Sequence, residues 1–231
     1  MITLRHANER GQADLGWLQT YHSFSFGEYY DPAHMGFSAL RVINDDIIQP
    51  GAGFDTHGHK EMEIITFVLK GSIAHRDSEG NVETLPAGEF QLMSAGRGIA
   101  HSEFNPSDTE ALHLLQIWIQ PNTFGGQPGY QQKTFTVQTG LTPIATPTGA
   151  QGTLQIKQDA TLYQLTLPPH TTHTMPVAAG RQVYIHQVEG ELAINEVPLS
   201  AGDGAKIRDE TALTLRNTSD STVTALVFDL P

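Results

Sequence analysis

Short runs of apolar residues recur along most of the chain, and turn residues separate them. Runs of this kind, rich in Val, Ile, Leu and Phe, predict β-strands, and no long amphipathic helix is indicated. The polar triplet Asn44-Asp45-Asp46 and the pairs Pro50-Gly51 and Gly125-Gly126 are interpreted as turns. The pattern predicts an all-β protein, either a sandwich or a closed barrel. The predicted strands are Phe37–Ile43, Glu63–Leu69, Glu89–Met93, Leu112–Ile119, Leu162–Leu167, Val183–Val188 and Thr222–Phe228.

The two halves of the chain share one pattern. In the first half a predicted strand ends at Gly71, and the motif Leu-Pro-Ala-Gly follows, ending at Gly88. In the second half a strand ends at Gly190, and Leu-Ser-Ala-Gly ends at Gly202. Glycine suits turns that need a positive φ angle. The repeat predicts two similar β-barrels in tandem, over residues 1–130 and 131–231.

The amino-acid composition excludes several kinds of site and disfavours some classes of binding partner. The 231 residues include no cysteine, which excludes disulfides, thiolate metal sites, iron–sulfur clusters and a cysteine nucleophile. The 25 acidic and 13 basic residues give a net charge of −12, which disfavours direct binding to nucleic acid or to anionic membranes. No apolar run reaches the roughly 18 residues of a membrane helix, and no signal peptide is indicated. We therefore expect a cytoplasmic protein.

Two short motifs carry most of the candidate chemistry: His57-Gly58-His59 and His101-Ser102-Glu103. Residues two apart on a strand point to the same side, so each motif presents two polar side chains together. Three imidazoles and a carboxylate can bind Fe(II), Cu(II), Ni, Mn or Zn and leave a coordination position open for catalysis. Glu63 has the same parity as the first pair of histidines, so this reasoning leaves it open as the carboxylate ligand.

These motifs also resemble a known family. The segment from Gly51 through the first His pair to Glu63 is similar to the first cupin motif, and the segment from Gly88 to Asn105 is similar to the second. The run from Met93 to Glu103, Met-Ser-Ala-Gly-Arg-Gly-Ile-Ala-His-Ser-Glu, is very similar to the pirin signature. Further similarity to pirins lies in His22-Ser23-Phe24-Ser25-Phe26, Tyr30-Asp31-Pro32 and Gly36-Phe37-Ser38. The resemblance implies a bicupin, with two jelly-roll-like cupin barrels.

The pirin pattern implies a ligand set as well. It assigns His57, His59, His101 and Glu103 to one divalent transition metal ion, and it selects Glu103 over Glu63. Fe(II) is the expected metal, with Cu, Mn, Ni and Zn as alternatives. The second barrel is expected to lack a metal site, and its His170 and His173 are expected in loops. Candidates for contact with a substrate, each with core packing as the competing interpretation, are Phe67, Leu69, His75, Met93 and Phe104.

The resemblance implies an activity, that of a metal-dependent quercetin 2,3-dioxygenase. Such an enzyme opens the heterocyclic ring of a flavonol with O₂ and releases CO, and Glu103 would act as its general base. The alternative is a metal-binding, redox-sensing regulator that acts through a protein partner and has no catalysis. A monomer is expected, because two barrels in one chain form a self-sufficient unit.

Overall fold

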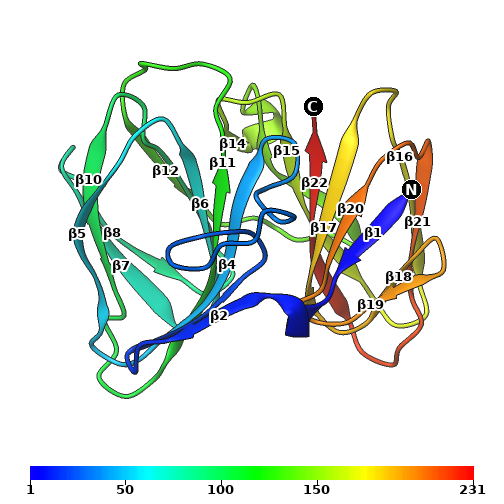
Figure 1. Ribbon diagram of the computed structural model, residues 1–231, viewed down its shortest axis with the longest axis horizontal. Helices are drawn as coiled ribbons and strands as arrows, with labels where there is room; N and C mark the ends of the chain where they lie inside the picture. The colour runs from blue at the N-terminus through cyan, green and yellow to red at the C-terminus, as the bar shows by residue number, and fades with distance from the viewer. The chain divides into compact units, whose positions relative to one another are not determined.

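The computed structural model describes residues 1–231 as two compact units whose regular secondary structure is almost all β-strand (Figure 1). The N-terminal unit contains Gly11–Phe135 together with Ile156–Gln158. The C-terminal unit contains Met1–Arg10, Thr136–Gln155 and Asp159–Pro231. The two helices, η1 (Ala7–Glu9) and η2 (Ala150–Gly152), are single 3₁₀ turns, and neither approaches the length of a membrane span.

In the N-terminal unit, a seven-stranded sheet and a four-stranded sheet form the barrel. The larger sheet has the order β12-β9-β6-β11-β4-β3-β2, and the smaller has the order β5-β10-β7-β8. A buried apolar cluster that includes Val68, Ile73 and Leu114 packs inside this barrel. The strands are β2 (Gly11–Asp14), β3 (Leu18–His22), β4 (Leu40–Ile48), β5 (Gly53–His59), β6 (Glu63–Lys70), β7 (Ser72–Asp77), β8 (Val82–Pro86), β9 (Phe90–Ser94), β10 (Ile99–Phe104), β11 (Leu112–Ile119) and β12 (Gly129–Lys133).

The C-terminal unit repeats this architecture. Its larger sheet has the order β1-β20-β17-β22-β15-β13-β14, and its smaller sheet has the order β16-β21-β18-β19. Its strands are β1 (Ile2–Arg5), β13 (Gly140–Thr146), β14 (Leu154–Gln155), β15 (Thr161–Leu167), β16 (Thr172–Pro176), β17 (Gln182–Glu189), β18 (Leu192–Ile194), β19 (Val197–Leu199), β20 (Gly204–Ile207), β21 (Ala212–Asn217) and β22 (Val223–Leu230).

The internal repeat predicted from the glycines is present in the backbone. Gly71 and Gly190 have φ angles of 81° and 80°, and Gly88 and Gly202 have φ angles of 86° and 84°. The two glycines of each pair therefore form the same turn in the two units. The positive φ angle of that turn would strain the backbone of a residue with a side chain. One edge strand is supplied differently. In the N-terminal unit β12 pairs with β9, whereas in the C-terminal unit β1, from the start of the chain, pairs with β20.

Two local predictions are wrong. Asn44-Asp45-Asp46 is not a turn but lies inside β4, where Asn44 pairs with Gln116 of β11 and with His22 of β3. Hydrogen bonds from both neighbouring strands outweigh the weak strand propensity of Asn and Asp.

His173 lies in β16 rather than in a loop, opposite Leu215 of β21. The predicted strand Leu112–Ile119 is confirmed with the same limits.

Candidate metal centre and its cavity

Two adjacent antiparallel strands carry the candidate ligands. His57 and His59 come from β5, and His101 and Glu103 come from β10, with His101 opposite His57. The register shifts between His101 and Glu103, which marks a β-bulge. The strands approach so closely there that a Cβ atom at Gly53 would lie 2.2 Å from the carbonyl oxygen of Glu103. Glycine at position 53 thus permits the backbone geometry that places Glu103 beside the histidines.

The three imidazole rings converge on one point. The Nε2 atoms of His57 and His59 lie 3.0 Å and 2.9 Å from Nε2 of His101. Two nitrogen ligands that are each about 2.1 Å from one metal ion, at right angles to each other, are about 3 Å apart. The spacing of these nitrogen atoms therefore fits three ligands of a single ion.

The protonation state of the histidine rings also favours the binding of a cation. Nδ1 of His57 donates a hydrogen bond to the backbone oxygen of Asp55 over 2.7 Å, which leaves the lone pair on Nε2. Burial, together with a smaller contribution from the neighbouring His57, lowers the pKa of His59 to about 4. Burial and the imidazoles of His57, His59 and His75 lower the pKa of His101 to about 3. Near neutral pH, His59 and His101 are therefore uncharged, and each can offer a nitrogen lone pair.

Glu103 is the candidate carboxylate donor that lies beside His101. Its carboxylate is 2% exposed, and Oε2 lies 3.9 Å from Nε2 of His101. Oε2 accepts a hydrogen bond from Nε2 of Gln116 over 3.0 Å, whereas Oε1 is buried without a hydrogen-bond partner. A buried carboxylate oxygen without a hydrogen-bond partner is costly unless a cation neutralises it. The residues therefore fit a divalent transition metal ion.

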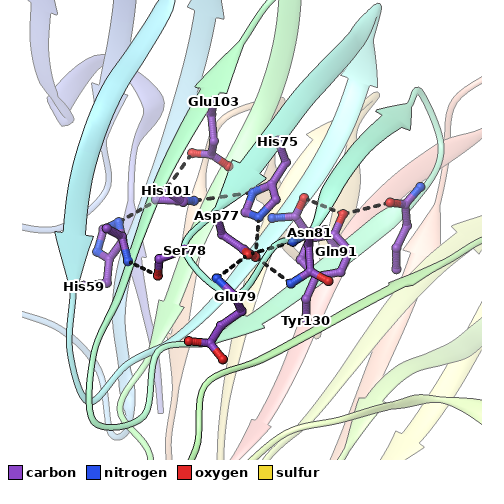
Figure 2. Close-up of polar contacts among 12 residues, drawn as sticks. His59, His75, Asp77, Ser78, Glu79, Asn81, Gln91, His101, Glu103 and Tyr130 are labelled. Carbon is purple, nitrogen blue, oxygen red and sulfur yellow. Dashed lines mark hydrogen bonds and ion pairs between the residues drawn. The ribbon is translucent and has the colours of Figure 1, made fainter.

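A second line of polar groups lies behind His101 (Figure 2). Nδ1 of His101 lies 3.5 Å from Nδ1 of His75, and Nε2 of His75 donates to Oδ2 of Asp77 over 2.9 Å. The backbone N–H groups of Glu79 and Asn81 donate to Oδ1 of Asp77, each over 3.0 Å. His75 and Asp77 are therefore fixed by a tight turn, and they limit the rotation of the His101 ring.

Glu63, the alternative carboxylate, lies in a different environment. Its Oε2 accepts hydrogen bonds from Oγ of Ser94 over 2.8 Å and from the backbone N–H of Lys157 over 3.1 Å. Burial raises the pKa of Glu63, and these hydrogen bonds partly oppose that effect. Its carboxylate joins β6 to β9 and to the segment at Lys157. The structure thus brings His57, His59 and His101 into one group and Glu103 into a second group with His75 and His101, and Glu63 belongs to neither.

A cavity of about 690 Å³ opens beside the cluster, and His57, His59 and Glu103 form part of its wall. Aromatic side chains form another part. The Trp118 ring lies 5.0 Å from that of His59 and 5.3 Å from that of Phe26, almost perpendicular to both. The volume falls within the range of about 300–1,000 Å³ that small-molecule sites occupy. The cavity can accept a flat aromatic ligand next to the cluster.

Sequence reasoning missed the polar side of this cavity. β3, β4 and β11 contribute Thr20, His22, Asn44, Asp46 and Gln116 to the lining. Two signals in the sequence pointed to these residues: the pirin-like run that begins at His22, and the polar run Asn44-Asp45-Asp46, which is interpreted as a turn. In contrast, the five residues suggested as substrate contacts do not line the cavity: Phe67, Leu69, His75, Met93 and Phe104.

The corresponding strands of the C-terminal unit carry other residues. In β16 and β21, Thr174 faces Thr214 and Met175 faces Leu213. Met175 and Leu213 belong to a buried apolar cluster that fills this unit. His170 has a positive φ of 55° and forms an exposed hydrogen bond with Asp220, with its Nε2 2.9 Å from Oδ1. The interior of this unit is packed with hydrophobic side chains at the level of these strands.

Comparison with known proteins identifies the class. Residues 3–119 match the family model described as Pirin, and residues 143–230 match the one described as quercetinase C-terminal cupin domain. The chain belongs to the pirin family and has its cupin fold, as the resemblance of the motifs implied.

Individual relatives cover the whole chain. A protein of Escherichia coli K12 named quercetin 2,3-dioxygenase is 53% identical over 231 residues, which are 100% of this chain and 99% of that protein. The crystal structure of YhhW from Escherichia coli is 52% identical, with a TM-score of 0.97 and coverage of 100% of this chain and 98% of that one. Bacterial pirin YhhW in complex with nickel(II) gives a TM-score of 0.96 at 52% identity, covering 100% and 99%.

Proposed function

We propose that this protein is a metal-dependent dioxygenase that cleaves the heterocyclic ring of a flavonol such as quercetin. The observation that carries the proposal is the opening of the imidazole cluster into a cavity with aromatic walls. A relative that is 53% identical over the whole chain is named quercetin 2,3-dioxygenase, which supports the same reaction class.

In this proposal His57, His59, His101 and Glu103 bind one divalent metal ion. When bound, the ion supplies Lewis acidity toward the 3-hydroxyl group of the flavonol and a centre for reaction with O₂. Fe(II) is the proposed ion, and the same nitrogen and oxygen donors accept Cu, Mn, Ni or Zn. Nickel(II) is present in a complex of a similar pirin.

Glu103 has a second role, that of proton acceptor. An ionised carboxylate has about four acceptor positions, and Gln116 uses one of those on Glu103. The carboxylate therefore has capacity both for the metal and for the proton of the substrate's 3-hydroxyl group. Gln116 keeps the carboxylate in one orientation while the proton is transferred.

The aromatic walls bind the flat rings and exclude water. The side chains of Phe26, Tyr29 and Trp118 offer apolar surfaces to the ligand at the cavity. In the overall reaction both atoms of O₂ enter the organic product, and the carbon that carries the 3-hydroxyl group leaves as CO. Exclusion of water protects the reactive flavonolate from competing protonation.

The test is quercetin depletion in air, followed by absorbance. Protein treated with a chelator is reloaded separately with Fe(II), Cu(II), Mn(II), Ni(II) and Zn(II), and His101→Ala serves as the control. Turnover with a redox metal, lost in His101→Ala, is the expected result. Stoichiometric metal binding without turnover for any ion would overturn the proposal and favour the metal-sensing regulator with a protein partner. Monomeric state and cytoplasmic location stay predictions.

A further inference from the structure

A second polar group lies at the cavity, apart from the imidazole cluster: the carboxyl group of Asp46. It lies near the end of β4, between Thr20 of β3 and Leu114 of β11. Asp46 lines the cavity and is only 3% exposed. A carboxyl group buried this deeply costs free energy unless hydrogen bonds replace those to water.

Within the protein those hydrogen bonds are incomplete. The hydroxyl of Thr20 donates to the carboxyl group of Asp46, but Oδ1 of Asp46 has no partner. Burial raises the pKa of Asp46 to about 7. The adjacent Asp45 points to the other face of β4, where its Oδ1 pairs with Nε2 of His113 over 2.6 Å. Asp46 thus has a carboxyl oxygen that can still accept or share a hydrogen bond at the cavity wall. The carboxylate of Asp45 is engaged with His113 on the other face of β4.

The position of Asp46 relative to the cluster follows from the strand register. Asn44 lies on the same face of β4 as Asp46 and opposite Gln116, the residue that holds Glu103. Two residues along a strand correspond to about 7 Å. A rigid ligand with one end at Glu103 can therefore extend along β4 so that its other end reaches Asp46.

We propose that Asp46 is a specificity-determining residue that hydrogen-bonds a phenolic hydroxyl group of the ligand. That hydroxyl belongs to a ring remote from the oxygen atoms that face His57, His59 and Glu103. The inference rests on the proposed function, because it concerns the same ligand in the same cavity. A buried polar group built to bind a hydroxyl discriminates against an analogue without it, since that analogue leaves the group unpaired.

The test measures binding, so that it is independent of turnover. Calorimetric titrations without O₂ use the full chain loaded with Ni(II) and two ligands, quercetin and 3-hydroxyflavone. Both ligands have the 3-hydroxy-4-keto unit, but only quercetin has hydroxyls on the remote rings. Asp46→Leu removes the hydrogen bond, Asp46→Asn retains hydrogen-bonding atoms, and Asp45→Asn is the matched control on the other face of β4.

We expect Asp46→Leu to raise the Kd for quercetin about tenfold and that for 3-hydroxyflavone less than about twofold. Asp46→Asn should retain most of the affinity for quercetin, and Asp45→Asn should alter neither Kd. Equal losses for both ligands, no loss for quercetin, or equal affinity of the unchanged protein for both ligands would each overturn the inference. If discrimination holds but quercetin is not turned over, the dioxygenase proposal fails and the role of Asp46 stands.

Discussion

Nε2 of Gln116 donates a hydrogen bond to Oε2 of Glu103 over 3.0 Å, and the hydroxyl of Thr66 donates to Oε1 of Gln116 over 3.1 Å. Because Thr66 engages the amide oxygen, the amide NH₂ group faces Glu103. Thr66 and Gln116 are opposite each other on the central strands β6 and β11. The orientation of Glu103 at the cluster is therefore set from inside the larger sheet.

This relationship predicts the effect of Gln116→Leu on metal binding. Loss of a residue that orients a ligand typically weakens metal affinity about 10- to 100-fold, and we expect a loss in that range. Competition with a chromogenic chelator measures it. Thr66→Val removes the hydrogen bond to the side-chain amide of Gln116 but keeps that amide, so it should cause a smaller loss of metal affinity. Unchanged affinity in Gln116→Leu would mean that Glu103 is held by other contacts.

Glu63 and Glu103 are distinguished by their alanine variants. Glu63→Ala leaves the hydroxyl of Ser94 and the N–H of Lys157 without their acceptor, so the free energy of unfolding should fall by about 2–4 kcal/mol. Its metal content should stay at one ion per chain. Urea unfolding and elemental analysis measure the two properties. A folded Glu63→Ala protein without metal would identify Glu63 as a ligand.

Glu103→Gln separates the two proposed roles of Glu103. Glutamine keeps an oxygen donor but cannot accept the substrate proton, so kcat should fall by about 10²- to 10⁴-fold. Metal affinity should fall much less, by about tenfold. Steady-state kinetics with metal-saturated protein, together with chelator competition, compare the two losses. Parallel losses of metal and turnover would leave Glu103 as a ligand alone.

Asp46 predicts a dependence of stability on pH. Burial raises its pKa from 3.8 to about 7; Asp45 adds to the increase, and the Thr20 hydroxyl and His113 oppose it. Folded protein therefore retains a proton that the unfolded chain releases above pH 3.8, and stability falls as pH rises from there to about 7. The loss reaches about 4 kcal/mol and is complete above that range.

The control for this dependence is Asp46→Asn, which does not titrate at that position. The difference in unfolding free energy between the unchanged protein and Asp46→Asn, from urea unfolding at several pH values, should shift in favour of Asp46→Asn with rising pH. Glu103, whose pKa burial also raises to about 7, is present in both proteins, so its titration cancels in the difference apart from the part of its shift that the charge of Asp46 causes. A difference independent of pH would mean that Asp46 is ionised in the folded protein throughout.

Much of the fold could be predicted because its signals are local. Strand Leu112–Ile119 follows from its apolar run, and Gly71 and Gly190 mark equivalent turns because both need a positive φ angle. The same locality explains one error. Asn44-Asp45-Asp46 has the composition of a turn, and only pairing with β3 and β11 makes it a strand.

The amino-acid sequence by itself determined the all-β class, the repeat, and the two polar pairs on alternating positions, since all of these depend on spacing along one strand. Spacing alone left both Glu63 and Glu103 open as the carboxylate, the pirin resemblance selected Glu103, and the tertiary structure places Glu103 beside His101. Glu63 and Glu103 both match the parity, and the bulge in β10 beside Gly53 brings Glu103 to the cluster. The tertiary structure also decided that Asp46 faces the cavity. Both outcomes depend on register between strands distant in sequence, and the period of a single strand carries no information about register.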